Sequence, residues 1–406
     1  MEWKEVTLGE VSSKIGDGLH GTPKYDDEGS YYFINGNNLN CGKIIIKDDT
    51  KRVGIEEFVK NQKELNEQTI LVSINGTIGN VAKYNNEPCI LGKSACYINV
   101  VKEVDKEFIY YVLTSANFKR NITNEATGTT IKNVSLKQMR EYKFNIPCNI
   151  SYQHRIASIL SSLDRKIELN NKINADLEEM AQAIFKNWFV DFEPFKDGKF
   201  VDSELGMIPE GWKVGRADDF YQINIGKTPP RKEHKWFSTN PADKIWVSIA
   251  NMGNSGIFIS DSSEYLTKEA VDRHNIIMVP RNTILLSFKL TVGRVAIADK
   301  ELTTNEAIAR FILSDDKYME YLYLYLKNFD YNSLGSTSSI ATAVNSKTIK
   351  GMQMLQPSDK IIDAFHIQVN PIFEKIRSLT KESSRLSLLR DTLLPRLMSG
   401  ELEVPE

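Results

Sequence analysis

Apolar residues recur at alternating spacings of four and three in two long stretches of the chain. The first stretch runs from about Gln153 to Phe192, and a shift of 209 residues, the separation of Trp3 from Trp212, brings the pattern back near the C-terminus. This alternation is the seam of a coiled coil, so it predicts two helices of about 40 residues and about 60 Å that pack on each other. The seam positions are Ile156, Leu160, Leu163, Ile167, Asn170, Asn174, Leu177, Ala181, Ile184 and Trp188, then Phe365, Val369, Ile372, Ile376, Leu379, Ser383, Leu386, Arg390, Leu393 and Leu397.

The segments that precede the two long helices share one pattern of short strands and a helix. From Trp212 the plan of the first segment repeats, and TILLSFKLTVGRVAIA (Thr283–Ala298) corresponds to TILVSINGTIGNVAKY (Thr69–Tyr84). A repeat of this length indicates a duplicated domain-plus-helix unit rather than a solenoid. The predicted strands of the first copy are Tyr31–Ile34, Lys43–Ile46, Thr69–Ile74, Val81–Tyr84 and one that ends at Pro147, and the predicted helices are Phe108–Phe118 and its counterpart Tyr318–Leu326.

The predicted fold class is α+β, with two mixed α/β domains, two long antiparallel coiled-coil helices and an internal two-fold repeat. The expected boundaries are a first domain at 1–150, a first helix at 151–192, a linker at 193–211, a second domain at 212–358 and a second helix at 359–400. One position departs from the repeat, because Pro371 stands where the first helix has Ser162. Proline lacks a backbone donor, so we expect it to kink the second helix or to shift its start.

Composition limits the compartment and the partners. The chain has no run of eighteen apolar residues and no apolar core near its N-terminus, so we expect no membrane span, no signal peptide and a cytoplasmic location. The four cysteines lack CxxC spacing, which favours free thiols over a disulfide framework or a zinc site. A net charge of −2 and a pI near 6.3 argue, taken alone, against a nucleic-acid binder.

Several segments resemble one protein family. These are TILVSINGTIGNVA, the run from TGTTIKNVSLKQM through PCNISYQHRIASILSSLDRKIELNNKINADLEEMAQAIFKNWFVDF, the linker ELGMIPEGW and the C-terminal LLPRLMSGEL. With these segments, nearly the whole chain resembles the specificity subunit of a Type I restriction–modification enzyme. The family pattern is a target-recognition domain and a spacer helix, each present twice.

The resemblance implies a role in DNA recognition within a larger complex. Each recognition domain would read one half of a split site in double-stranded DNA, and the two helices would set the gap and recruit two methyltransferase subunits. Restriction motor-nuclease subunits would join that assembly. S-adenosylmethionine, ATP and Mg²⁺ are expected on those partners, with no cofactor and no metal on this chain, and no catalytic residue is expected here.

Polar loops at equivalent places in the two domains are the candidate DNA contacts. Loop one is HGTPKY (20–25) against GKTPPRKEHKW (226–236), and loop two pairs the asparagines of FINGNNLNCG with those of WVSIANMGNSG. Loop three is SINGT against SFKLT, and loop four holds Thr129, Thr130 and Lys132 against Thr342, Asn345 and Lys347. Cations suit phosphates and asparagine suits adenine, although Asn-Gly is also a plain turn, and both readings stay open. The candidates are His20, Thr22, Lys24, Tyr25, Asn35, Asn37, Asn38, Asn75, Thr77, Thr129, Lys132, Lys227, Thr228, Arg231, Lys232, Lys235, Asn251, Lys289, Arg294 and Lys347.

The helix ends offer candidate partner contacts. A single two-helix seam uses one stripe only, so the neighbouring aromatic residues form a second stripe that either binds methyltransferase subunits or packs on the adjacent recognition domain. Both possibilities remain open from the sequence. Asn170, Asn174 and Ser383 interrupt the apolar seam, where buried polar groups can fix the register of paired helices. The candidate partner residues are Phe185, Trp188, Phe189, Leu393, Leu394 and Leu397.

Two other classes of function are alternatives. One is a methyltransferase fused to its own recognition domain, and the tetrapeptide Asn370–Phe373 resembles an adenine-methyltransferase motif but lacks its second proline. The other is a stand-alone DNA-binding scaffold or repressor. The G-x-G-x-x-G match at Gly16–Gly21 is rejected as a dinucleotide loop because Thr22-Pro23 does not begin a helix convincingly. The low net charge predicts that partner subunits supply much of the DNA affinity.

Overall fold

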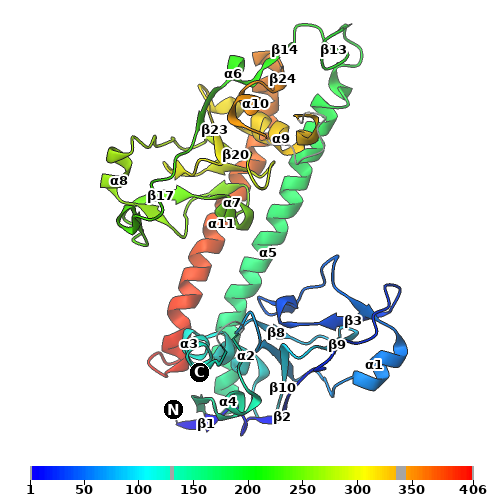
Figure 1. Cartoon of the computed structure of the whole chain (residues 1–406), viewed down its shortest axis with the longest axis vertical. Helices are drawn as coiled ribbons and strands as arrows, with labels where there is room; N and C mark the ends of the chain where they lie inside the picture. Colours follow the sequence, from blue (N-terminus) through cyan, green and yellow to red (C-terminus); the bar gives the residue numbers. More distant parts are fainter. Residues whose placement is uncertain (1, 129–131, 335–343, 405–406) are drawn as a thin grey trace. The chain divides into compact units, whose positions relative to one another are not determined.

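The chain folds as two compact units that both take a part of each long helix. The computed structural model describes residues 2–128, 132–334 and 344–404, and of Asn254 only the backbone. Unit 1 comprises 1–168 and 384–406, and unit 2 comprises 169–383. The long helices are α5 (Ile150–Phe189) and α11 (Asp359–Met398), which are drawn in green and in orange to red in Figure 1. Each helix therefore leaves one unit and enters the other.

Unit 1 is built around a four-stranded sheet in the order β2-β10-β7-β8. Helix α2 packs on β7 and β8, and the strand pair β1-β11 brings the two ends of the first domain together. The strands are β1 (Trp3–Thr7), β2 (Ser12–Asp17), β3 (Tyr31–Ile34), β4 (Leu39–Asn40), β5 (Lys43–Ile44), β6 (Arg52–Val53), β7 (Thr69–Ser73), β8 (Val81–Lys83), β9 (Cys89–Leu91), β10 (Ala95–Val100) and β11 (Lys143–Pro147). The helices are α1 (Ile55–Asn61), α2 (Lys106–Thr114), α3 (Ala116–Glu125) and α4 (Leu136–Glu141).

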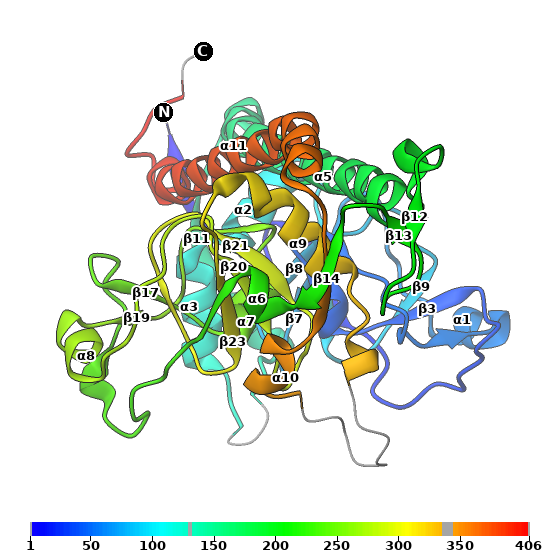
Figure 2. The same ribbon diagram turned by 90° about the horizontal axis from the view of Figure 1, so that it is seen from above.

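Unit 2 repeats this plan. Its main sheet has the order β15-β23-β20-β21-β18, its pair β14-β24 corresponds to β1-β11, and α9 packs on β20 and β21 as α2 does in unit 1 (Figure 2). The strands are β14 (Lys213–Arg216), β15 (Gln222–Ile225), β16 (Phe237–Ser238), β17 (Lys244–Val247), β18 (Phe258–Ile259), β19 (Tyr265–Leu266), β20 (Ile284–Ser287), β21 (Val295–Ala298), β22 (Thr303–Thr304), β23 (Ile308–Ile312) and β24 (Gln353–Gln356). The helices are α6 (Ala217–Phe220), α7 (Ile249–Asn254), α8 (Lys268–Arg273), α9 (Met319–Asn328) and α10 (Ser346–Lys350), and the linker pairs β12 (Phe200–Val201) with β13 (Ile208–Pro209).

The two long helices pack antiparallel within each unit. In unit 2, the Asn170 side-chain amide donates to the Ser383 hydroxyl over 3.3 Å, and that of Asn174 donates to the Thr380 hydroxyl over 3.3 Å. Residue numbers rise along α5 as they fall along α11, as antiparallel packing requires. The polar seam positions predicted from the sequence thus meet polar partners, and Asn170 is fully buried.

Each core joins the sheet of a unit to both long helices. In unit 1, Ile156 and Leu160 of α5 and Leu397 of α11 belong to the same apolar cluster as Phe108 of α2. In unit 2, the corresponding cluster includes aromatic residues from α5, α9 and α11. The sheet of each unit is therefore joined to the long helices through a continuous core.

Several local expectations need correction. The predicted helix Phe108–Phe118 is two helices, because Ser115 has extended backbone angles and its hydroxyl caps α3 by accepting from the Phe118 amide over 3.2 Å. The predicted strand Lys43–Ile46 ends at Ile44. Helix α11 begins more than three turns before Pro371, so the proline does not shift its start. No helix follows Gly16–Gly21, which agrees with the rejection of that motif as a dinucleotide loop.

Candidate nucleic-acid interface

Loop three has the same hydrogen-bonded frame in both units. In unit 1 the Gly79 amide donates to the Ser73 carbonyl over 2.9 Å, and the Asn80 amide donates to the Ser73 hydroxyl over 2.8 Å. In unit 2 the Gly293 amide donates to the Ser287 carbonyl over 3.0 Å, and the amide of the next residue donates to the Ser287 hydroxyl over 3.0 Å. The frame is conserved between the copies while the residues that it presents differ.

Loops three and four of unit 1 are joined. Asn75 and Asn133 form an antiparallel bridge, and their side-chain amides are hydrogen bonded over 3.1 Å. The Gly76 amide also donates to the carbonyl of Lys132 over 3.1 Å. These contacts bring three predicted candidates, Asn75, Thr77 and Lys132, to one place, and the side chains of Thr77 and Lys132 are exposed. Thr129, the remaining candidate of this loop, lies outside the described residues.

Loop one of unit 2 meets loop three around Glu306. The Lys227 amide donates to the Thr304 carbonyl over 2.9 Å, and the Thr228 hydroxyl donates to the Glu306 carboxylate. Burial by itself raises the pKa of Glu306, but the Thr228 hydrogen bond and the nearby Lys289 and Arg231 outweigh it, so the pKa lies below its ordinary value. An ionised carboxylate therefore sits among the cations of both loops. The repeat does not single out Glu306, because the first copy has Lys93 at the equivalent place.

Arg231 is held in a defined orientation. Its guanidinium makes a two-pronged ion pair with Glu264, at 2.7 and 3.1 Å, and lies 4.4 Å from the ring centre of Trp246 and 4.3 Å from that of Phe237. A planar guanidinium suits such stacking better than an ammonium would. Lys232, the next residue, is exposed. This loop therefore combines one fixed cation with one that extends into solvent.

Several predicted contacts have structural roles instead. Asn38 is buried and donates to the Ile45 carbonyl and the Thr50 hydroxyl, and Asn251 caps α7 in reciprocal hydrogen bonds with Ser248. The Arg294 guanidinium donates to a backbone carbonyl of α7 over 2.8 Å. For Asn38, Asn251 and Arg294, hydrogen bonding within the fold therefore accounts for the side chain. Asn38 is buried, whereas Asn251 and Arg294 are half-buried, and the contacts of all three with DNA stay predictions.

The other candidates lie on the loops with part or all of the side chain in solvent. Lys24, Asn37 and Lys289 are exposed, and Asn35 is half-buried, where its side-chain oxygen accepts from Ser94. Their contacts with DNA stay predictions. The remaining exposed or half-buried candidates are His20, Thr22, Tyr25, Lys227, Thr228, Lys235 and Lys347.

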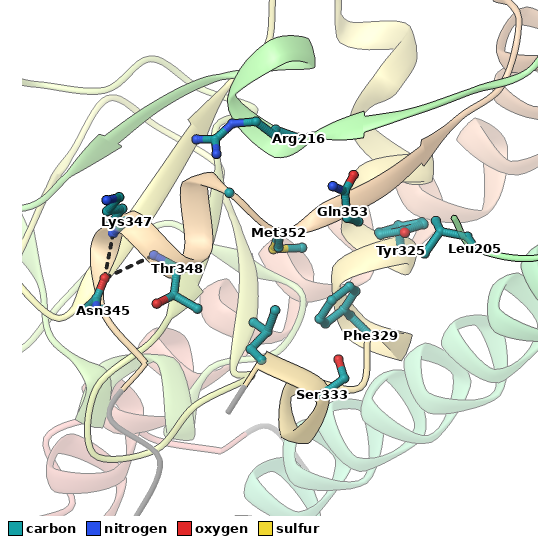
Figure 3. Close-up of a pocket in the computed structure, with 12 residues that line it drawn as sticks. Leu205, Arg216, Tyr325, Phe329, Ser333, Asn345, Lys347, Thr348, Met352 and Gln353 are labelled. Carbon is teal, nitrogen blue, oxygen red and sulfur yellow. Dashed lines mark hydrogen bonds between the residues drawn. The ribbon is translucent and has the colours of Figure 1, made fainter. Parts of the chain in front are cut away.

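A recess of about 630 Å³ adjoins loop four of unit 2. Figure 3 shows Tyr325, Phe329 and Met352 on its apolar side and Asn345 and Lys347 at its polar edge. The Asn345 carboxamide oxygen accepts hydrogen bonds from the backbone amides of Lys347 and Thr348. These bonds cap α10 and hold the backbone at the polar edge of the recess. Lys347 is thereby held at the mouth of the recess with an exposed side chain.

Two features of the described residues concern metals and membranes. Within it, no group of three or more His, Cys, Asp or Glu residues could hold a metal ion. Among the same residues, no helix is both long and apolar enough to cross a bilayer.

Both copies of the repeat match one family of known proteins. The model of the Type I restriction modification DNA specificity domain matches residues 1–179 and again 209–365. The chain belongs to this specificity family. The two matches fall on the two copies of the repeat, and together they cover most of the chain.

Two specificity subunits from other organisms cover most of this chain. The MjaIX specificity subunit of Methanocaldococcus jannaschii is 29% identical over 397 residues, which cover 95% of this chain and 87% of the relative. The HindI specificity subunit of Haemophilus influenzae is 28% identical and covers 73% of this chain and 77% of its own. The crystal structure of a Type I specificity subunit from Mycoplasma genitalium aligns with a TM-score of 0.58 at 18% identity, over 98% of this chain and 96% of the other. The last comparison supports the fold.

The predicted partner contacts of this specificity protein are largely internal. Phe185 and Phe189 are only 3% and 5% exposed, and both lie in the unit 2 core with Tyr321 and Phe365. Leu394 and Leu397 are buried in unit 1, while Trp188 and Leu393 are half-buried against the same cores. The second alternative, packing on the adjacent recognition domain, therefore accounts for the four buried residues, whereas Trp188 and Leu393 keep part of their side chains in solvent and stay predictions.

A different pair of apolar residues is exposed on α11. Leu388 is 70% exposed and Leu389 is 45% exposed, and both lie off the seam positions Leu386 and Arg390. Apolar residues beside a coiled-coil seam occupy positions that a two-helix pair leaves in solvent, so in a sequence they indicate a surface for a further partner. The predicted partner residues all lie near one end of a long helix, so Leu388 and Leu389, farther from the end of α11, were not among them.

Proposed function

We propose that each recognition domain reads one half of a bipartite DNA site. The observation that carries this proposal is the loop-three frame, which recurs in both units around Ser73 and Ser287 with different residues at its tip. A conserved frame with variable presented side chains is what two readers of different sequences require. The exposed cations Lys232 and Lys289 support phosphate contacts in the second reader.

The test is to locate the methylated DNA motif of cells that carry the complete system. We expect a motif in two parts with an unspecific gap. Exchanging the exposed unit 1 residues Asn37 and Thr77 for alanine should then relax one part only, while Lys232→Ala and Lys289→Ala weaken modification without changing the other part. Lys268→Ala, on α8 outside the four loops, is the matched control. A change in both parts from the unit 1 exchange contradicts independent reading.

We further propose that the long helices bind two methyltransferase subunits and set the distance between the half-sites. Support comes from the membership of the specificity family and from the exposed Leu388 and Leu389 on α11. Replacement of both leucines by serine should weaken assembly with the methyltransferase, as measured by sedimentation, without loss of helix content. Met180→Ser, at another exposed apolar position on a long helix, α5, serves as the control. Assembly that survives the leucine exchange unchanged contradicts this surface.

On this proposal the methyl donor, ATP and Mg²⁺ act on the partner subunits, and motor-nuclease subunits join the same assembly. The highly purified chain should transfer no methyl group to DNA on its own, even when S-adenosylmethionine is added. Methyl transfer by the chain alone would instead favour a fused methyltransferase.

A further inference from the structure

An apolar side chain stands fully in solvent at the tip of loop three in unit 2. Leu290 is 98% exposed and has a φ of +62°. The Thr291 amide donates to the Lys289 carbonyl over 2.7 Å, so Leu290 is the central residue of a γ-turn with positive φ. This turn is rare and strained, and residues with a Cβ atom disfavour it. Neither burial nor backbone geometry accounts for a leucine here.

The equivalent place in unit 1 holds the residue that the backbone favours. Gly76 has a φ of +73°, and no atom lies within 4 Å of where its Cβ would stand, so the tip is equally open in both units. The frames match, because Ser73 and Ser287 accept the same amide hydrogen bonds. The leucine of unit 2 therefore makes this loop less stable than a glycine would. Strain of this kind concentrates at functional positions.

The leucine is held in place by its loop. The Ser287 hydroxyl donates to the Thr291 carbonyl over 2.5 Å, and the Phe288 amide donates to the Ala307 carbonyl over 3.0 Å. Lys289 stands beside it, with its ammonium 5.6 Å from the centre of the Phe288 ring. The tip thus offers a fixed apolar side chain next to a cation.

We propose that Leu290 is an apolar wedge that enters between neighbouring base pairs of DNA bound by unit 2, with Lys289 on an adjacent phosphate. The inference rests on the proposed function. Leucine is among the side chains that proteins insert at base steps, and the nearby cation suits the backbone that flanks such a step. Because the whole side chain stands clear of the loop, it can enter to its full length. With glycine at the same place, unit 1 inserts nothing, so only one half-site is unstacked.

The experiment uses the chain assembled with its methyltransferase subunits and a duplex that carries the methylated motif. The duplex contains 2-aminopurine at successive positions of the half-site assigned to unit 2, away from the base that is methylated. Wild-type complex should raise the fluorescence at one step, because unstacked 2-aminopurine is brighter. Leu290→Gly and Leu290→Ala should abolish that rise and weaken binding about tenfold, equivalent to about 1.4 kcal/mol. Leu290→Phe should keep the rise.

The control is Met207→Ala, which removes an exposed apolar side chain from the linker and should change neither signal. Leu290→Gly suits the positive φ, so its fold is retained. A fluorescence rise that persists in the Leu290→Gly complex overturns the wedge. The wedge is also overturned if the variants bind DNA more weakly but the wild-type complex raises the fluorescence at no base step. If the wild-type complex modifies no bipartite site, the proposed function fails first and the wedge fails with it.

Discussion

At the scale of single residues, Gly76 and Leu290 form a matched pair within one chain. Leu290→Gly should raise the free energy of unfolding of unit 2, because it relieves about 1–2 kcal/mol of left-handed strain against about 0.5–1 kcal/mol of added chain entropy. Gly76→Leu should lower the stability of unit 1 by a similar net amount, since the open tip provides no contact to offset the strain. Urea unfolding of the full chain, followed by hydrogen exchange of each unit, measures both. If both variants changed the free energy of unfolding in the same direction, backbone strain at Leu290 would be contradicted.

The cysteines should fall into two classes of reactivity. Cys41 and Cys148 are exposed, whereas Cys89 and Cys96 are buried. Burial, with a smaller contribution from Glu87, raises the pKa of Cys89 to about 12, and burial also raises the pKa of Cys96. The thiolate is the reactive form, so at pH 8 the buried pair stays protonated and shielded. A thiol reagent should titrate two groups quickly in the native chain and four after denaturation. Rapid reaction of a third thiol would contradict this assignment.

The repeat identified the loops but not the role of each side chain. Asn37 and Asn38 are neighbours of the same type, yet one is exposed and the other is buried as a hydrogen-bond donor within the fold. Composition cannot separate these two cases, because the partners of Asn38 come from residues that lie beyond the next strand. Glu306 was missed for a related reason, since its place among the cations depends on how two distant loops meet.

At the scale of elements, the two long helices could be predicted because their apolar spacing persists for about ten turns. The break at Ser115 could not, since large apolar residues continue with helical spacing across it and only the backbone angles reveal two helices. The aromatic residues at the end of α5 were ambiguous for another reason. Spacing identifies the positions outside the seam but not which element covers them.

Phe189 allows a test of what covers the end of α5. It packs on Trp212, Tyr321 and Phe365, with ring centres 4.8–5.7 Å apart. Phe189→Ala should therefore destabilise unit 2 by about 3–5 kcal/mol, the cost of emptying a core site. Thermal unfolding measures the effect, and Val190→Ala, one residue along and exposed, should stay within about 0.5 kcal/mol of wild type. A stable Phe189→Ala chain that only fails to assemble would restore Phe189 as a partner contact.

At the scale of the whole molecule, the proposed spacing role of the helices predicts a change in the DNA motif. Four residues added to α5 after Glu168 and to α11 after Ser383 lie where both helices pass from one unit to the other. They add about 6 Å, close to two base pairs at about 3.4 Å each. The four residues also rotate one end of each helix by about 40° relative to the other, whereas two base pairs rotate the DNA groove by about 70°. We expect the same half-sites with a longer gap and lower efficiency.

Sequencing of methylated DNA from cells with the lengthened chain measures this change. An insertion of the same four residues in the linker after Glu204 is the control, because it leaves both helices intact. Full methylation at the original gap would show that the helices do not set the distance.

The division of the chain also has a consequence for its synthesis. Unit 2 is one continuous stretch, 169–383, whereas unit 1 needs both 1–168 and 384–406. Although residues 1–168 leave the ribosome first, Ile156 and Leu160 must wait for Leu394 and Leu397 before their cluster closes. The part made second can therefore finish folding before the part made first. A nascent chain that stops at Ser383 holds a complete unit 2 and exposes the unfinished apolar face of unit 1, the kind of surface that chaperones bind.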